Sequence, residues 1–173
     1  MNPEMKESFP NISIEIYNES DKSGLITALS DLQEFERRIT DTLRPGPEIS
    51  EDYFKELQNN ILEKSGIIFV AKDNNGKFVG FISCLIEERN DVLHTAESNK
   101  YGYIADAYVI PSLRGKGIFS QLSRKAEEYI YKFEDIKFIR MHVNAENVQA
   151  LNAYKHLGYV PESIKLIKKI ERK

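Results

Sequence analysis

Several short segments of the chain carry alternating or continuous apolar residues, and this pattern predicts β-strands. The segments are 12–17, 67–72, 77–87, 103–110 and 136–143. Between the second and third lies the sequence Asp73-Asn74-Asn75-Gly76, which favours a turn, so these two strands are expected to form a hairpin. Residues 163–170 carry the same alternation and are expected to close the sheet.

Apolar residues at helical spacing predict helices over 23–39, 51–64, 118–133 and 148–157. Ser50 is the expected N-cap of the second helix, and Asn147 that of the last, which Gly158 is expected to end. Strands and helices of this kind predict a mixed α/β fold. At 173 residues the chain can bury a sizeable core, and residues 1–173 are expected to form a single domain.

Composition narrows the class of protein. Hydrophobic residues make up 41% and charged residues 29%, which is typical of a globular chain. With a net charge of -3 the chain lacks the basic excess of a general nucleic-acid binder. It carries no apolar run of membrane-spanning length and no signal-peptide core, and Cys84 is its single cysteine, so a cytoplasmic protein is expected. The spacing of His94, His142 and His156 indicates no metal site.

The segment from Tyr103 to Leu122 reads as a strand, a glycine-rich loop and the start of a helix. This order directs backbone N–H groups and the positive end of a helix dipole at one point, so an anion site is expected. A P-loop is excluded because Ile110 stands where its first glycine is required and Ile118 follows Gly117. A dinucleotide-binding loop is excluded because Ser120 occupies its third glycine position.

A third loop pattern, R-x-x-G-x-[GA], is matched by Arg114 and Gly117, although Phe119 stands where the pattern has Gly or Ala. A second signature follows after a further strand, with the spacing Asn144, Asn147, Ala150, Tyr154, Gly158. Together the two signatures resemble the GNAT N-acetyltransferase superfamily, over about residues 65 to 165. The region before Ile67 is similar, more weakly, to bacterial members of that superfamily.

The resemblance implies the GNAT fold and acetyl-CoA as co-substrate. That fold has a central, mostly antiparallel mixed sheet of roughly six to seven strands with one splayed parallel pair, flanked by about four helices. The pantetheine arm would pair with strand 105–109 where it parts from strand 139–143, and the pyrophosphate would bind amides of the loop. The residues expected to bind the cofactor are Ala107, Tyr108, Val109, Arg114, Gly115, Lys116, Gly117, Ile118, Phe119, Ser120, Asn147 and Tyr154.

The resemblance also implies catalytic roles. Tyr154 is the expected general acid that returns a proton to the CoA thiolate, and the Val109 N–H is the expected oxyanion donor. Many relatives carry a glutamate base on the central strand, but Ala105 occupies that position here. Asp106 is the only carboxylate on this strand, so it is the candidate base; it is equally suited to ordering the strand or attracting a cation.

Acidic residues such as Glu36, Glu87 and Glu88 lie in segments expected to roof the cleft, which suggests a cationic primary amine as the acceptor, either a small molecule or a peptide. The absence of a strand glutamate and the presence of Phe119 leave a second interpretation open, an acyl-CoA-binding sensor without activity. Acetylation of charged tRNA is a third interpretation, which the lack of a basic excess disfavours. The final strand offers a route to a homodimer.

Overall fold

The computed structural model describes residues 11–170 of the chain. They fall into two compact units, one up to His142 and one from Val143 onward. The strands are β1 (Ser13–Ile16), β2 (Ile67–Lys72), β3 (Phe78–Glu88), β4 (Lys100–Val109) and β5 (Ile139–Met141). The α-helices are α1 (Lys22–Arg37), α2 (Gly46–Glu63), α3 (Ala96–Asn99), α4 (Ile118–Ile130) and α5 (Val148–His156), with 3-10 turns η1 (Glu19–Asp21) and η2 (Pro111–Leu113).

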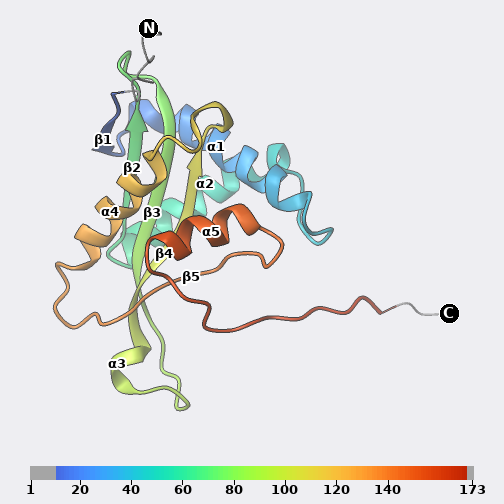
Figure 1. Ribbon diagram of the computed structural model, residues 1–173, viewed down its shortest axis with the longest axis vertical. Coiled ribbons are helices and arrows are strands. Elements are labelled where there is room, and N and C mark those ends of the chain that lie inside the picture. Colours follow the sequence, from blue (N-terminus) through green and yellow to red (C-terminus); the bar gives the residue numbers. More distant parts are fainter. Residues whose placement is uncertain (1–10, 171–173) are drawn as a thin grey trace, which may run out of the picture. The chain divides into compact units, whose positions relative to one another are not determined.

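The strands of the first unit form one sheet in the order β1-β2-β3-β4-β5 (Figure 1). Neighbours are antiparallel except for the parallel pair β4 and β5. The predicted mixed, mostly antiparallel sheet and its β2–β3 hairpin are therefore confirmed. The sheet has five strands within residues 11–170, fewer than the expected six to seven.

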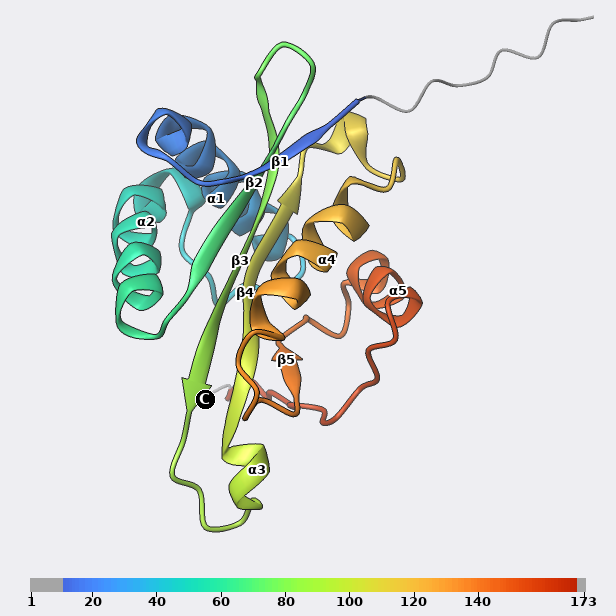
Figure 2. The ribbon, with the colours of Figure 1, turned by 90° about the vertical axis from the view of Figure 1, so that its left-hand side faces the viewer.

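Helices cover both faces of this sheet, with α1 and α2 on one face and α4 on the other (Figure 2). On the α4 face, the helix buries the apolar residues that its sequence pattern predicts, among them Ile118, Leu122, Ala126 and Ile130. On the α1–α2 face, Leu25 and Leu29 of α1 and Phe54 and Leu57 of α2 pack against the sheet. Within residues 11–170 no helix is both long and apolar enough to cross a bilayer.

Helix α2 begins at Gly46, five residues before the predicted start at Glu51, so the expected cap at Ser50 is wrong. The first turn contains Pro47, which fits there because its missing N–H needs no partner at a helix start. The Gly46 N–H donates to Glu34 Oε1 of α1 at 2.7 Å. A contact between two helices therefore sets where α2 starts, and a proline–glycine segment alone does not reveal it.

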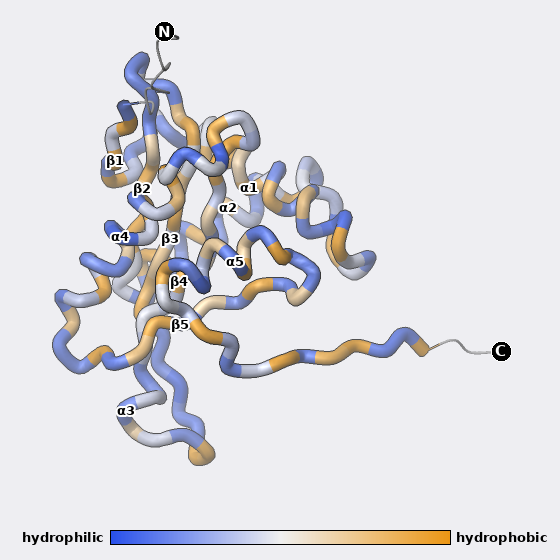
Figure 3. Tube along the Cα trace, viewed as in Figure 1, coloured by the Kyte–Doolittle hydropathy of each residue, from blue (hydrophilic) through white to orange (hydrophobic). Residues whose placement is uncertain are grey.

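The second unit contains the predicted helix α5, and its cap is confirmed because Asn147 Oδ1 accepts from the Ala150 N–H at 3.1 Å. Gly158 follows with φ at 93°, the left-handed conformation that ends helices. The strand predicted over 163–170 is wrong, since these residues adopt no secondary structure. Figure 3 shows apolar positions along this segment, and Ile164, Leu166 and Ile167 are all exposed.

Candidate active site

A β-bulge at Ala105 divides β4 into two parts. Asp106 lies opposite Ser83 of β3, and Ile104 lies opposite Cys84, so Ala105 is the extra residue. Before the bulge, the Gly102 N–H donates to the Phe138 carbonyl, toward β5, at 3.0 Å. After it, the Asp106 N–H donates to Ser83 Oγ, toward β3, at 3.0 Å. The bulge therefore reverses which alternate residues of β4 face each neighbouring strand.

As a result, the backbone groups of Ala107 and Val109 face away from β3, on the side of β5. The Ile110 N–H agrees with this alternation, because it donates to the carbonyl of Val79 in β3 at 3.0 Å. The parallel pairing with β5 runs only from Gly102–Ile139 to Ile104–Met141. Beyond it, no strand within residues 11–170 pairs with this side of β4, and this open edge is suited to an extended ligand that adds like a strand.

The loop after β4 is built to direct amides at an anion. Gly115 and Gly117 have φ values of 75° and 76°, and a Cβ at either position would meet no atom within 4 Å. Gly117 is the N-cap of α4, whose ladder begins with the Gln121 N–H donating to the Gly117 carbonyl. The amides of Ile118, Phe119 and Ser120 precede that bond and point out of the helix start. These features suit an anion, and the pyrophosphate of CoA stays a prediction for this loop.

Phe119, which departs from the loop pattern, is half-buried and packs against the core on the α4 face. A residue in the first turn of a helix can turn its side chain toward the core while its N–H stays at the helix start. The bulky side chain is therefore compatible with an anion at the amides, and Phe119 stays a predicted cofactor contact through its backbone.

Arg114 is oriented differently from the other loop residues. Its Nε–H donates to the Val109 carbonyl at 3.0 Å. Its guanidinium carbon lies 5.7 Å from the centre of the Tyr108 ring and 5.8 Å from that of Phe35 on α1. The Tyr108 hydroxyl in turn donates to Asp31 Oδ2 at 2.9 Å. The side chains of Arg114 and Tyr108 thus connect the end of β4 to α1.

On the α1–α2 face of β4, Asp106 is 8% exposed and accepts a short hydrogen bond from the Tyr53 hydroxyl of α2. Ser83 Oγ also lies 3.5 Å from its Oδ2. Burial raises the pKa of the Asp106 carboxyl, and the two hydroxyls oppose that shift. Burial, followed by the charge of Asp106, raises the pKa of Tyr53 as well. A buried carboxyl with a perturbed pKa, such as that of Asp106, is common in functional sites.

Tyr103 and His142 form a second polar pair near Asp106. The Tyr103 hydroxyl lies 2.9 Å from His142 Nδ1, and their rings meet edge to face with centroids 5.8 Å apart. Burial raises the pKa of the Tyr103 phenol, and the charge of Asp106 adds to that effect. The pair joins β4 to the residue just after β5, so it lies where the parallel pairing ends.

The other predicted site residues lie in different surroundings. Glu87 is half-buried and accepts from Lys64 Nζ at 2.7 Å, which partly neutralises it, whereas Glu88 is exposed. Glu36 is half-buried on α1, and Lys116 is exposed on the loop. Tyr154 and Asn147 belong to the second unit, so their proposed roles at β4 stay predictions.

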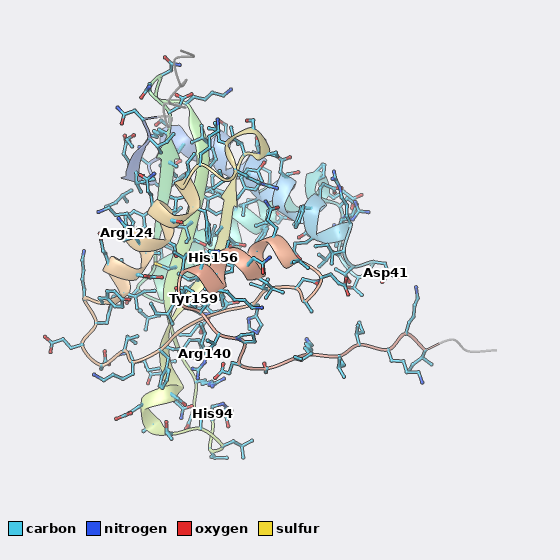
Figure 4. All side chains as sticks on the ribbon, viewed as in Figure 1. Asp41, His94, Arg124, Arg140, His156 and Tyr159 are labelled. Atoms are coloured by element: carbon cyan, nitrogen blue, oxygen red, sulfur yellow. The ribbon has the colours of Figure 1, made fainter. Side chains whose placement is uncertain are left out.

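The segment between β3 and β4 contains the short helix α3, which is not among the helices that the sequence pattern predicts. Arg140 of β5, labelled in Figure 4, donates to the Ser98 carbonyl of α3 at 2.8 Å. Its guanidinium carbon also lies 4.7 Å from the Tyr101 ring centre. The hydrogen bond from Arg140 to Ser98 connects the α3 segment to β5, beside the Tyr103–His142 pair.

Tyr53, Ser83, Tyr103 and His142 are site residues that the sequence does not identify. Tyr53 and Ser83 follow the ordinary pattern of a helix and a strand, whereas Tyr103 stands on β4 and His142 follows β5. The packing of α2 on the sheet brings Tyr53 to Asp106, and the register of the strands brings the other three near it. Among the residues that the structure describes, no group of three or more His, Cys, Asp or Glu is placed to hold a metal ion.

Comparisons with known proteins agree with this geometry. Residues 28–159 match the acetyltransferase (GNAT) family. An uncharacterised N-acetyltransferase of Methanocaldococcus jannaschii is 31% identical over 112 residues, covering 65% of this chain and 46% of the relative. The catalytic subunit of the Arabidopsis thaliana N-terminal acetyltransferase A complex is 28% identical over 101 residues, covering 58% of this chain and 49% of the relative.

The chain thus spans about half the length of these curated relatives. Among solved structures, a mutant protein from Bacillus halodurans superposes with a TM-score of 0.78 at 18% identity, covering 92% of this chain and 99% of that one, and it shares the fold. The family match covers most of the chain and includes the open edge of β4, the glycine loop and α5. The chain belongs to the acetyltransferase (GNAT) family.

Proposed function

We propose that the chain transfers an acetyl group from acetyl-CoA to a cationic primary amine, by direct attack of the amine in a ternary complex. The observation that carries this proposal is the Ala105 bulge, which turns the backbone of Ala107 and Val109 toward the open edge of β4. Along the chain, this edge is followed by the glycine loop and by the amides of Ile118, Phe119 and Ser120 at the start of α4. A donor with an extended amide arm and a pyrophosphate matches both features at once.

The chain's own groups have defined tasks on the donor side. Ala107 pairs with the amides of the pantetheine arm, and the loop amides bind the pyrophosphate. The Val109 N–H donates to the thioester oxygen and stabilises the negative charge that develops there during attack. In the second unit, Tyr154 is the proposed general acid for the leaving thiolate, and Asn147 a contact to the cofactor.

A primary amine is mostly protonated near neutral pH and must lose a proton before it attacks. Two groups on the α1–α2 face can accept that proton. His142, with Tyr103 bonded to its Nδ1, is exposed and open to a substrate. Asp106 is buried behind the Tyr53 hydroxyl, so an amine reaches its carboxylate only through Tyr53 or a water. We therefore assign proton removal to the Tyr103–His142 pair, with Asp106 as the alternative base.

The acceptor is proposed to be cationic because carboxylates surround this face. Asp106 lies within it, and Glu87 and Glu88 end the neighbouring strand β3. Glu36 lies on α1, which covers the same face. Their negative field would raise the local concentration of a positively charged amine. The Arabidopsis relative is named for N-terminal acetylation, so a peptide amine belongs among the candidates beside small polyamines and aminoglycosides.

The direct test is acetyl transfer by the full chain across an acceptor panel. Spermidine, an aminoglycoside, peptides with a free N-terminus or a lysine, and neutral and anionic acceptors would be incubated with acetyl-CoA. CoA thiol release and the mass of the acetylated product would both be recorded. The proposal predicts products only with cationic primary amines. Transfer only to neutral or anionic acceptors would contradict it, and acetyl-CoA binding without turnover would identify a sensor.

The base assignment is tested by Tyr103→Phe and His142→Gln. Loss of a general base lowers kcat/KM about 10²-fold or more near neutral pH. The loss should shrink as pH rises toward the pKa of the amine, where the free base form of the acceptor becomes abundant. Tyr131→Phe is the matched control, because Tyr131 is 69% exposed at the end of α4. If Asp106→Asn alone shows this pH-dependent loss, Asp106 is the base instead.

A further inference from the structure

We propose that Arg114 is a positioning residue, which fixes the end of β4 so that the Val109 N–H faces the reacting thioester, and that it does not bind the pyrophosphate. This inference rests on the proposed function, since it assigns a residue to the donor side of that site. It departs from the expectation drawn from the loop pattern, in which Arg114 is a phosphate contact.

The first support is the bond between Arg114 and Val109. The Arg114 Nε–H donates to the carbonyl oxygen of Val109 at 3.0 Å, and this bond closes the turn from β4 through η2 into the loop. In a strand, the N–H and C=O of one residue face the same edge. A donor fixed on the carbonyl of Val109 therefore also restrains the direction of its N–H.

The second support is the stack that holds the guanidinium. Its carbon lies 5.8 Å from the Phe35 ring centre and 5.7 Å from the Tyr108 ring centre. Tyr108 is itself 6% exposed and is fixed by the bond from its hydroxyl to Asp31. Asp31 and Phe35 lie one turn apart on α1, so they face the same side of that helix. Helix α1 thus holds both Arg114 and Tyr108, and through them the last residues of β4.

The third support is the direction of the side chain. Tyr108 packs in the core on the α1–α2 face, and the Arg114 guanidinium lies over its ring. The amides from Ile118 to Ser120 open α4, which covers the other face of the sheet (Figure 2). The guanidinium is therefore engaged with α1 and β4 rather than with the start of α4. Lys116, which is exposed on the loop, is the cation placed for a phosphate.

A lysine at position 114 separates the two roles. It retains the positive charge but has neither the planar group that stacks between rings nor an N–H at the position of Nε. If Arg114 served only as a charge for the pyrophosphate, Arg114→Lys would be mild. If Arg114 positions Val109, the substitution removes the bond and the stack together.

The experiment compares two donors, acetyl-CoA and S-acetyl-pantetheine, which lacks the pyrophosphate. For Arg114→Lys we expect kcat to fall about 10- to 100-fold with both donors, because a displaced donor group no longer matches the reacting carbonyl. The KM for acetyl-CoA should change little. Lys116→Met gives the opposite pattern, a higher KM with acetyl-CoA and wild-type kinetics with S-acetyl-pantetheine. If Arg114→Lys shows that second pattern, the inference is overturned.

Two further variants and one spectrum keep the test decisive. Phe35→Leu and Tyr108→Phe, which weaken the stack and the Asp31 bond, should lower kcat in the same direction by less. In an ¹⁵N spectrum of the free protein, the Arg114 Nε–H should exchange slowly, and Arg114→Lys should shift the Val109 amide signal. If the wild type acetylates no amine, the proposed function fails. The two signals still report whether the Arg114 Nε–H is bonded to the Val109 carbonyl. Fast exchange of the Nε–H would overturn the positioning role of Arg114.

Discussion

At the scale of single residues, Asp106 has the least ordinary environment in the described site. Its carboxyl is nearly removed from water and has two hydroxyl neighbours, Tyr53 and Ser83. A buried carboxylate is costly unless hydrogen bonds compensate for its lost hydration. Burial is the largest influence on its pKa and raises it, so compensation is incomplete. Asp106 therefore reduces the stability of the fold near neutral pH.

Stability should accordingly depend on pH through this residue. The pKa of Asp106 is raised in the folded chain, so between the unfolded and folded pKa values the native state holds a proton that the unfolded state has released. Stability therefore falls as pH rises through this range. Asp106→Asn, which keeps an acceptor oxygen for Tyr53, should raise the melting temperature at pH 7. The gain is worth about 1.4 kcal/mol for each unit of the pKa shift.

Thermal unfolding between pH 3 and pH 8 would measure this effect. The advantage of Asp106→Asn should vanish below the usual pKa of an aspartate, where both states are protonated. Asp52→Asn, at an exposed carboxylate of α2 that pairs with Lys55, should leave the curve almost unchanged. A lower melting temperature for Asp106→Asn at pH 7 would show that Tyr53 and Ser83 more than compensate for burial.

The sequence identifies Asp106 because it is the only carboxylate on a strand followed by the glycine loop. It cannot identify Tyr53, which is 53 residues away and resembles any apolar residue of an amphipathic helix. The same holds for Tyr103 and His142, whose contact depends on the register of β4 and β5. Local patterns thus indicate single chemical groups, and pairs between distant segments require the fold.

At the scale of elements, the bulge in β4 decides which backbone groups are available. The alternation of residues predicts the strand but not the point where its phase reverses, since Ala105 occupies the extra position without any special residue type. The start of α2 and the absent strand over 163–170 have similar causes. The start of α2 depends on the hydrogen bond to Glu34 of α1, and a strand over 163–170 would need a neighbouring strand to pair with. Neither tertiary contact can be inferred from the local sequence.

The close pairing of β3 with the end of β4 can be tested at Gly80, which lies opposite Val109. A Cβ at Gly80 would lie 2.6 Å from the backbone oxygen of Tyr108, so β4 would have to move. We expect Gly80→Ala to destabilise the fold by about 1–3 kcal/mol in urea unfolding and to weaken acetyl-CoA binding.

The control for this prediction is Gly76→Asn in the β2–β3 turn. Gly76 has φ at 73° and no atom within 4 Å of a built Cβ, and asparagine tolerates this conformation. Its unfolding free energy should change by no more than about 0.5 kcal/mol. Wild-type stability and acetyl-CoA affinity in Gly80→Ala would show that the end of β4 is not held closely against β3.

At the scale of the whole molecule, the sheet of the first unit separates two cores. Cys84 lies on β3 within the core that α4 covers and has no exposed surface. Burial raises the pKa of its thiol to about 12, so the reactive thiolate is scarce in the native chain. Cys84 thus serves as a small apolar residue of β3 in this core.

The thiol therefore reports on unfolding of this core. A disulfide reagent should modify Cys84 only after urea has unfolded the chain, with one thiol released per molecule. Native protein should give no signal, which also allows CoA release to be followed with the same reagent. Rapid modification of the native chain, at a rate independent of its unfolding, would show that the core opens without global unfolding.

The proposed function requires that acetyl-CoA binds along the open edge of β4 and at the start of α4. An acetyl-CoA titration of the ¹⁵N-labelled chain tests this most directly, because each amide reports its own contact. We expect saturable shifts of the Ala107 and Val109 amides together with those from Gly115 to Ser120. Shifts confined instead to the open pocket between α1 and the β2–β3 hairpin, near Thr27 and Lys77, would contradict it.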